Sequence, residues 1–562
     1  MRVFCAVIML ASIAVLPNLH AQPSATPAPI KTSTVLLTSA KGDQQKEIDP
    51  IVFKQDLENR KIDAAIIVDS TARRQTITGI GTSFTESSAY VLAHLEPSVR
   101  ATVMRALFSD RGANFSLTRT MIGSSDFSVH GRYNYAPVVD DSKLSHFSIG
   151  EDLKGFDLSA HPRIVDANYD LLPMIQEALA IKQDQRDAEL SIIASAWTAP
   201  PWMKDIENYY QPGTPETNFE GTGGQLKSGY ESLYADYLLR YMDAYAQQGI
   251  AIWGITPVNE PEGNSGQWES MHFTPDSQAT FITEHLGPKL RQSPHKDTKL
   301  LIFDQNRNHL ESWTNRILGD ATAAQYVYGT AVHWYSSTVN VYGDALERVH
   351  AQFPQFDIIH TEGTIDDLGK PAGGGIGDPK GFEETNWFNN DDFWWQKTAT
   401  DWAYTASWAA NANDHPMYTP VHRYARNIIG SLNHWVSGWI DWNPVLDARG
   451  GPNHVGNFCG APIMIDLDTK QVYYTPIFHI LSQFSRTIRP GDTVLTTAVN
   501  SSQLPPDALH AVASINADGL ISVQILNTGP APITLGVTLD KHNAVITMPA
   551  NALKTIQFNL AL

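Results

Sequence analysis

The chain begins and ends with short runs of apolar residues that have the character of β-strands. Near the start, TVLLT at Thr34–Thr38 and AAIIV at Ala64–Val68 are rich in β-branched and aliphatic residues. From about Thr493 onwards, short runs such as ISVQILN and AVITM alternate with Gly, Pro and Asn. Strands at this spacing are typical of a β-sandwich.

The long middle of the chain follows a different pattern, in which short β-like runs alternate with helical stretches such as Leu233–Gln248 and Pro275–Leu290. This alternation predicts a parallel α/β fold. The number of candidate strands is that of a closed (β/α)8 TIM barrel, in which active sites lie at the carboxyl ends of the strands. The eight candidates are Thr76–Ile80, Phe115–Thr120, Leu190–Ala196, Ile250–Thr256, Lys299–Phe303, Gly329–His333, Ile358–Thr361 and Gly438–Asp441.

The composition is that of a globular protein with an acidic surface. The chain has 562 residues, of which 42% are hydrophobic and 18% charged, and its formal net charge is −19. Nucleic acids and anionic membrane surfaces attract basic patches, so this charge argues against both as partners.

The amino terminus predicts export. Arg2 precedes an apolar run from Val3 to Leu16, and Leu19-His20-Ala21 resembles a signal-peptide cleavage site. We therefore expect a signal peptide over residues 1–21, cleaved after Ala21, and a secreted or periplasmic protein. A membrane anchor is the alternative, but the run of roughly 14 apolar residues is shorter than the about 20 that a spanning helix needs.

Two further features stand out. Cys459 is the one cysteine beyond the signal segment, and its flanking residues give no support for a nucleophile, so we expect a packed thiol. The stretch from Gly363 to about Thr400 is long and rich in Gly, Asn, Asp and tryptophan, which is typical of a functional loop.

Two glutamates directly follow predicted strands. Glu260 lies in TPVNEP and Glu362 in HTEG. Glycoside hydrolysis uses a pair of carboxyl groups, one that protonates the leaving oxygen and one that stays ionised. Strands of a parallel barrel end at the same rim, so both side chains are expected there. A single strand-end glutamate is more often solvated or ion-paired than catalytic, and the neighbouring residues decide between these interpretations.

The neighbours favour a sugar site. Asn259 precedes Glu260 and is placed to bind a sugar hydroxyl, while Trp197, Trp334 and Trp442 lie at or just beyond strand ends. Sugar rings stack on such aromatic faces. Any one of these tryptophans alone would more simply be explained as core packing.

Several motifs, in order, resemble glycoside hydrolase family 30, in particular its glucosylceramidase and β-1,6-glucanase members. The resemblance runs from about Gln75 to Ser485. The motifs are QTITGIGTSFTES at Gln75–Ser87, SLTRTMIGSSDFS at Ser116–Ser128, ASAWTAPPWMK at Ala194–Lys204, WGITPVNEP at Trp253–Pro261, AVHWY at Ala331–Tyr335, HTEGT at His360–Thr364, GWIDWN at Gly438–Asn443 and GGPNHVGNF at Gly450–Phe458.

The resemblance implies a retaining β-glycosidase that acts on β-glucosides by double displacement, with Glu260 as general acid/base and Glu362 as nucleophile. It implies that Asn259 binds the 2-hydroxyl, and that Glu86 falls where the family carries an Asp that holds the distal hydroxyls. The remaining glycone-pocket residues that it implies are Arg119, Trp197, His333, Tyr335, Trp442 and Asn457. For Arg119, a structural ion pair is the competing interpretation.

The resemblance also implies a β-sandwich side domain assembled from both chain ends. The expected boundaries are 1–21 for the signal peptide, 22–33 for a linker, 34–72 plus 486–562 for the sandwich and 73–485 for the barrel. No metal or organic cofactor is expected, because the sequence contains no zinc-protease, P-loop or nucleophile-elbow motif.

Three alternatives stay open. An endo-β-1,6-glucanase is the first, a xylan-directed enzyme the second and a non-catalytic carbohydrate-binding protein the third. The expected partner is a β-glucoside, a β-glucan or a glycolipid. On the aglycone side, Trp387, Trp394 and Trp395 are expected to offer flat apolar surface that stacks on further sugar units or covers a lipid chain.

Overall fold

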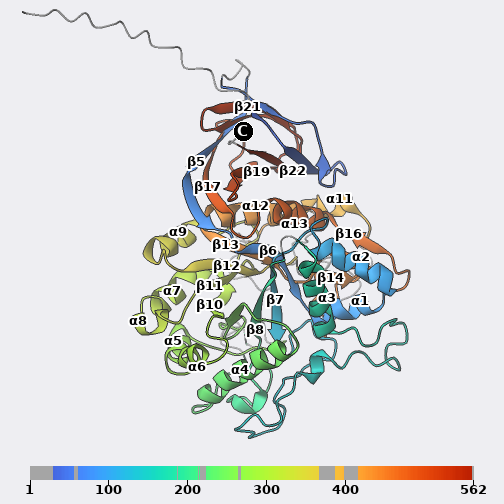
Figure 1. Cartoon of the computed structure of the whole chain (residues 1–562), viewed down its shortest axis with the longest axis vertical. Helices are drawn as coiled ribbons and strands as arrows, with labels where there is room; N and C mark the ends of the chain where they lie inside the picture. Colours follow the sequence, from blue (N-terminus) through green and yellow to red (C-terminus); the bar gives the residue numbers. More distant parts are fainter. Residues whose placement is uncertain are drawn as a thin grey trace, which may run out of the picture.

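The computed structural model describes residues 30–559 apart from 56–60, 186–187, 213, 215–222, 264–267, 366–386 and 398–414. It consists of a barrel and a β-sandwich stacked on one side of it (Figure 1). The expected signal peptide, most of the expected linker and most of the loop that follows Glu362 lie outside the described residues.

Eight parallel strands close into a barrel, which confirms the predicted fold class. Their order around the barrel is β10-β11-β12-β13-β6-β7-β8-β9. The strands are β6 (Gly79–Phe84), β7 (Leu117–Ile122), β8 (Ser191–Ala196), β9 (Gly254–Thr256), β10 (Lys299–Asn306), β11 (Gly329–His333), β12 (Asp357–Glu362) and β13 (Val436–Asp441). The first strand begins at Gly79 rather than at Thr76, because β5 (Ala64–Thr76) carries Thr76 as part of the sandwich sheet.

Helices surround the barrel. The predicted helix over Leu233–Gln248 is α4 (Glu231–Gln247). The predicted helix over Pro275–Leu290 consists of α5 (Pro275–Phe281) and α6 (Gly287–Gln292), which are joined by a π-helical turn at Ile282–Leu286. The other helices are α1 (Glu86–Ala93), α2 (Pro97–Phe108), α3 (Leu171–Gln183), α7 (Leu310–Ile317), α8 (Ala321–Ala324), α9 (Gly343–Gln352), α11 (Asp391–Trp394), α12 (Pro420–Asn433) and α13 (Pro476–Thr487).

The barrel interior changes from apolar to polar along the strands. A small cluster of fully buried side chains fills its lower part: Leu117, Ile193, Leu301, Ala331, Ile359 and Ile440. Side chains two residues apart in a strand point to the same face. The same strands therefore carry Arg119, Ser195, His333 and Thr361 into the next interior level, and this polar level is the floor of the candidate site. Glycine is required beside the apolar layer, since a Cβ on Gly438 would lie 2.6 Å from Leu117.

The sandwich sheet combines strands from both chain ends, as the predicted fold class requires. Its order is β21-β20-β5-β17-β18-β19-β22-β2-β3. Besides β5, the strands are β2 (Thr34–Ser39), β3 (Lys46–Glu47), β17 (Thr493–Asn500), β18 (Leu509–Ile515), β19 (Leu520–Asn527), β20 (Ile533–Leu539), β21 (His542–Met548) and β22 (Ala552–Asn559). They enclose a second apolar core, separate from the main core of the barrel.

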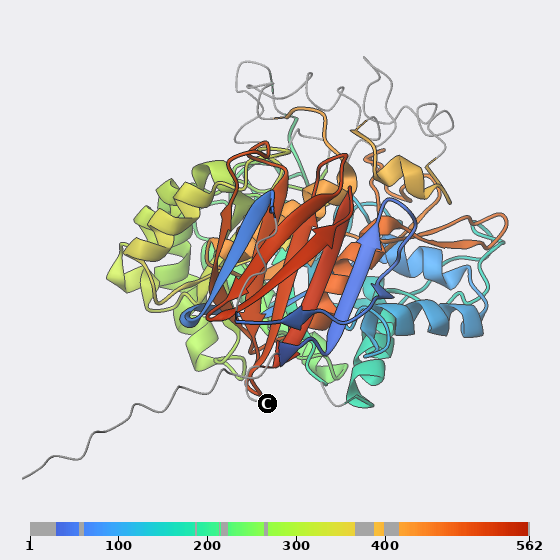
Figure 2. The same ribbon diagram turned by 90° about the horizontal axis from the view of Figure 1, so that it is seen from above.

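The helices α12 and α13 lie between the sandwich and the barrel (Figure 1), and Figure 2 shows the sandwich strands in front of the barrel helices. Gln483 on α13 fixes this junction, because its side chain accepts from Thr38 of β2 and donates to Thr555 of β22. A small sheet of β14 (Val445–Asp447), β15 (Ile463–Ile465) and β16 (Val472–Tyr474) precedes α13, and β1 (Ile30–Lys31) pairs with β4 (Val52–Phe53). Within the described ranges, no helix is both long and apolar enough to cross a membrane.

Candidate active site

A fully buried arginine organises the polar level at the carboxyl end of the barrel. Arg119, in the middle of β7, donates to Glu362 at 2.6 Å, to Asn259 at 2.7 Å and to Asp304 at 2.8 Å. Its Nε donates to Ser195. The two carboxylates compensate the cost of burying the guanidinium, and this one side chain joins two other predicted site residues, Glu362 and Asn259.

Asp304 enters this network through an irregularity in β10. The pairing of β10 with β11 shifts between Phe303 and Gln305, and both Phe303 and Asp304 have positive φ, at 73° and 63°. Backbone strain of this kind persists only where the surrounding structure holds it, and it is common at functional sites. The shift leaves Asp304 facing inward, where it accepts from Arg119, His333, Ser195, Thr256 and Thr361. Burial opposes the charge of Asp304, but Arg119 and His333 outweigh it and hold its pKa far below the ordinary value.

Glu260 follows β9 and faces His333 at the end of β11. The His333 ring places Nδ1 3.3 Å from Glu260 and Nε2 2.9 Å from Asp304. Burial would lower the pKa of His333, but the surrounding carboxylates Glu362, Asp304 and Glu260 raise it to about 9. Burial also raises the pKa of Glu260, and the charge of Glu362 adds to this, although His333 works in the opposite direction. Glu260 therefore holds a proton more readily than a solvated glutamate does.

Glu362, the last residue of β12, is 6% exposed and has donors on both carboxylate oxygens. Arg119 donates to Oε2, and the Tyr335 hydroxyl donates to Oε1 at 3.0 Å. Both oxygens thus serve as acceptors. The two glutamates both lie at the carboxyl ends of barrel strands, but they have different hydrogen-bond partners.

Glu260, His333 and Glu362 each contribute one atom to a cluster in which all three atoms lie within 4.8 Å of one another. Such a trio has the geometry of a cation site, but the donor chemistry is wrong for one. Both ring nitrogens of His333 face carboxylates, so they carry protons rather than lone pairs for a metal. Arg119 also already neutralises Glu362. The set suits an acid/base pair.

Two tryptophans form the aromatic part of the site. Trp197, just beyond β8, and Trp442, just beyond β13, stack with ring centroids 5.1 Å apart and planes 22° apart. The Arg119 guanidinium lies 4.8 Å from the Trp197 ring. Trp334 is as buried as these two, at 2% exposed, but its ring packs against Tyr424 and Trp439, so it belongs to the core.

Asn457 lies on the loop after β14 and brings a further acid to the site. Its side-chain amide donates to Asp126, which follows β7, at 3.0 Å. Asp126 is 3% exposed, and the charge of Glu362 acts on it. Burial raises the pKa of Asp126 to about 7, although the hydrogen bond from Asn457 lowers it.

Glu86, which the resemblance assigns to the distal hydroxyls, is held by the loop after β7 through one oxygen, while its Oε2 is buried without a hydrogen-bond partner among the described residues. It is 1% exposed, and its Oε1 accepts from the backbone amides of Val129 and His130. Burial raises its pKa well above the ordinary value, and the nearest acids that contribute are Asp170 and Asp152 rather than the two glutamates of the site.

The tryptophans of the loop after Glu362 are less accessible than expected. Trp387, Trp394 and Trp395 are 2%, 0% and 9% exposed, and Trp387 stacks on Trp394. The sequence suggested that they form a flat surface for an aglycone, but Trp387 and Trp394 pack against Phe393, and Trp395 packs against His422. Cys459 is buried, as expected.

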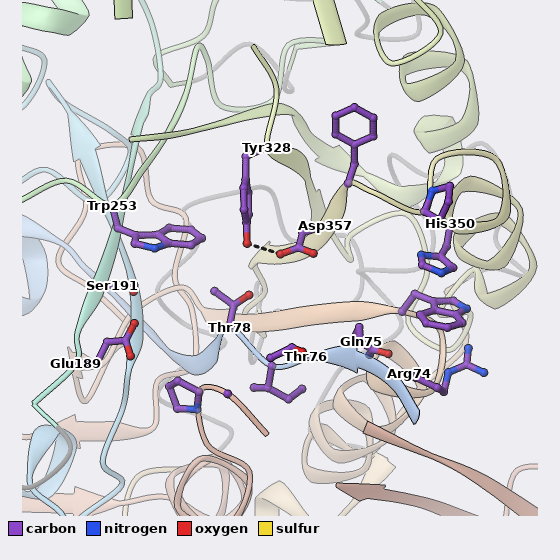
Figure 3. A pocket seen from close by; sticks show the side chains of 16 residues that line it. Arg74, Gln75, Thr76, Thr78, Glu189, Ser191, Trp253, Tyr328, His350 and Asp357 are labelled. Carbon is purple, nitrogen blue, oxygen red and sulfur yellow. Dashed lines mark hydrogen bonds between the residues drawn. The ribbon is translucent and has the colours of Figure 1, made fainter. Parts of the chain in front are cut away.

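A cavity of about 440 Å³ lies at the opposite rim of the barrel (Figure 3). Its lining includes residues at the amino ends of the strands, among them Thr78, Ser191, Trp253, Tyr328 and Asp357. Tyr328 donates a hydrogen bond to Asp357 there. Arg74 and Pro490, which flank the two connections to the sandwich, also line it. In TIM barrels this rim serves stability whereas chemistry occurs at the other, and this cavity contains none of the expected site residues.

Asp304 and Asp126 are the residues that sequence reasoning missed. Asp304 directly follows the predicted strand Lys299–Phe303, so the rule that singled out Glu260 and Glu362 would also have found it. Asp126 lies within the quoted motif SLTRTMIGSSDFS, but only folding shows that it reaches Asn457.

Comparison with known proteins agrees with this geometry. The chain matches the model of the glycosyl hydrolase family 30 TIM-barrel domain over residues 77–370 and 398–488, and that of the family 30 beta sandwich domain over residues 496–556. The lysosomal acid glucosylceramidase of Mus musculus is 30% identical over 467 residues, which cover 83% of this chain and 77% of that protein. An endo-1,6-beta-D-glucanase of Aspergillus fumigatus is 26% identical over 477 residues, covering 84% and 82%.

Solved structures share the fold. SrfJ from Salmonella typhimurium superposes with a TM-score of 0.74 at 22% identity, covering 95% of this chain and 100% of that one. An endo-beta1,6-glucanase superposes with a TM-score of 0.68 at 22% identity, covering 94% and 99%. With both domain models matched over most of the chain, the protein is a glycoside hydrolase and belongs to glycosyl hydrolase family 30.

Proposed function

We propose that this protein is a retaining β-glucosidase in which Glu362 is the nucleophile and Glu260 the general acid/base. The observation that carries the proposal is the spacing of the two carboxyl groups, whose facing oxygens lie within 4.8 Å of each other. Retaining enzymes hold the two groups about 5–5.5 Å apart, whereas inverting enzymes need about 6.5–9.5 Å to admit a water molecule.

The division of roles follows from the two environments. Hydrogen bonds from Arg119 and Tyr335 hold the Glu362 carboxylate in place, and each oxygen keeps a further lone pair that can attack the anomeric carbon. Glu260 has a raised pKa and therefore carries the proton that the leaving oxygen needs. In the first step the Glu362–carbon bond forms as the glycosidic bond breaks and Glu260 protonates the leaving oxygen. In the second step Glu260 takes a proton from water, and the water oxygen displaces Glu362.

The positively charged side chains of Arg119 and His333 lie beside Glu362 and Glu260 and act on these carboxyl groups electrostatically in both steps. Asp304 pairs with both cations and holds them in place. Asn259, bound to Arg119, is the proposed partner of the sugar 2-hydroxyl, where a hydrogen bond strengthens as positive charge develops on the ring.

The proposed glycone is β-linked glucose. Trp197 and Trp442 supply the apolar part of the pocket, and Asp126 with Asn457 supplies acceptors and donors for distal hydroxyls. The similarity to glucosylceramidases supports this choice. A pocket that hydrogen-bonds particular hydroxyls rejects sugars lacking them strongly. An aryl β-glucoside should therefore have a higher kcat/KM than the aryl β-xyloside, and equal values would remove the glucose assignment.

Stereochemistry tests the mechanism itself. Proton NMR of the first-formed product from an aryl β-glucoside should show the β-anomer before mutarotation. An α-configured first product would exclude the double displacement.

The second candidate is an endo-β-1,6-glucanase, an activity that two relatives carry in their names. Product analysis on gentiobiose, a β-1,6-glucan and glucosylceramide separates the candidates. Release of glucose from gentiobiose or of ceramide from glucosylceramide supports the β-glucosidase, and oligosaccharides released from the polymer support the endo-enzyme.

We also propose export after cleavage behind Ala21, on the basis of the apolar run at Val3–Leu16. Amino-terminal sequencing of the mature protein should begin at Gln22, and a mature chain that retains Met1 would exclude it.

A further inference from the structure

A second network of charged side chains contacts the Asp126 segment and takes no part in the proposed reaction steps. Its centre is His454, on the loop that also carries Asn457. The ring places Nδ1 2.9 Å from the carbonyl oxygen of Ser128 and Nε2 3.2 Å from the carboxylate of Glu269. Both partners only accept, so both ring nitrogens donate and the ring is an imidazolium.

Glu269 completes the network from a third segment. Its side chain is fully buried, and it also accepts from the Ser124 hydroxyl at 2.6 Å. Burial would raise the pKa of Glu269, but the hydrogen bond and charge of His454 hold it below the ordinary value. Burial would likewise lower the pKa of His454, and Glu269 raises it instead. Each group thus stabilises the charged form of the other.

The ion pair joins the chain segments that form one wall of the pocket. The backbone amide of His454 donates to the carbonyl oxygen of Asp126, and its ring holds Ser128 two residues later. Asn457, three residues beyond His454, binds the Asp126 carboxylate. Movement of His454 would therefore displace both Asp126 and Asn457.

Building on the proposed glycosidase site, we propose that the Glu269–His454 ion pair is a positioning device that sets Asp126 and Asn457 at the sugar-binding wall and thereby controls substrate affinity. The charged groups that face Asp126 are Glu362, His454 and Glu269, and those that face Glu269 are His454 and Lys204. The positive charge of His454 offsets Glu269, which would otherwise oppose ionisation of Asp126.

The test is a double-mutant cycle with Glu269→Gln and His454→Gln, assayed on an aryl β-glucoside. His454→Gln leaves Glu269 buried without its counter-charge, and such a loss should raise KM by about tenfold or more while kcat changes less. The double variant replaces the ion pair by two neutral amides and should recover most of the lost affinity. His295→Gln is the matched control, because His295, in the turn after α6, forms a similar pair with Asp243 on α4. It should leave KM unchanged.

The pH profile of KM distinguishes this role from a merely structural one. His454→Gln leaves the negative charge of Glu269 beside Asp126 without its counter-charge, so the acidic limb should shift to higher pH. Glu269→Gln removes that negative charge and also the partner that keeps His454 protonated, so it should not shift the limb to higher pH. Shifts in the same direction, additive effects in the cycle or an unchanged KM would overturn the inference. If His454→Gln does not fold, Glu269→Gln alone still tests the direction of the shift. Lack of turnover by the unmodified enzyme would count against the proposed function instead.

Discussion

Glu260 and Glu362 carry the same chemical group in two environments, and substitution should separate their tasks. Glu362→Gln removes the attacking oxygen charge and should reduce turnover of every β-glucoside by roughly six orders of magnitude, the scale observed when a protease nucleophile is removed. Glu260→Gln should spare the first step for aryl glucosides with good leaving groups, because these need little protonation. Steady-state and burst kinetics measure both effects.

Azide provides the control for this assignment. The small anion can replace water without general-base help, so it should restore turnover of Glu260→Gln and yield a β-glucosyl azide. Rescue of Glu362→Gln in place of Glu260→Gln would mean that the two roles are exchanged.

At this scale the sequence predicts the identity of the site residues better than their contacts. Glu260, Glu362, Asn259, Arg119, His333 and Tyr335 are all brought together, because strand ends of a parallel barrel meet at one rim. The contacts of Asp304 could not be predicted, since they depend on a one-residue shift in β10 that leaves no signal in a strand of alternating or continuous apolar residues.

Among the elements, the loop after β7 is held by Glu86, the acid that the sequence resemblance assigned to the sugar pocket. Glu86, at the start of α1, binds the backbone amides of Val129 and His130, and this loop carries Asp126. Glu86→Leu removes the acceptor of two buried donors, which should cost about 1–3 kcal/mol for each donor left unpaired and raise KM. Thermal unfolding and KM for an aryl β-glucoside measure the two effects.

Glu86→Gln is the matched control for this prediction. Burial raises the pKa of Glu86, so the neutral amide resembles the protonated acid and keeps one acceptor oxygen for the loop. It should retain near-normal KM. An effect of Glu86→Gln on KM as large as that of Glu86→Leu would instead favour direct contact of Glu86 with a sugar hydroxyl.

The elements themselves were largely predictable, and their ends were not. Continuous apolar runs predict buried parallel strands, and each of the eight runs corresponds to a barrel strand. The first strand is displaced because Thr76 continues the sandwich strand β5, a pairing across 400 residues that local pattern does not contain. The expectation of an exposed aromatic surface at Trp394 was wrong, because composition does not show which rings pack against one another.

The whole molecule contains a group of buried acids on the α1–α3 side of the barrel whose ionisation opposes folding. Asp152 accepts hydrogen bonds from the hydroxyls of Tyr133, Tyr135 and Tyr245 and is 1% exposed. Burial raises its pKa to about 7, although the three tyrosines act in the opposite direction. Asp152 and Asp170 in turn raise the pKa of Glu86. Protonation of this group is therefore linked to the stability of the entire fold.

The linkage predicts a protein that is more stable in mildly acidic than in neutral solution. The unfolded chain releases the Asp152 proton near pH 3.8, whereas the folded protein keeps it to about pH 7. Stability contributed by this group is thus full below pH 3.8 and declines as the pH rises through the folded pKa. Asp152→Asn cannot ionise, so the difference in Tm between about pH 5 and pH 7.5 should be smaller in this variant than in the unmodified protein. Asp157→Asn is the control, because Asp157 is exposed and hydrogen bonds from Ser159 lower its pKa, which places its titration outside this interval. An equal decline of Tm in the Asp152→Asn variant and in the unmodified protein would show that other groups govern the pH dependence of folding.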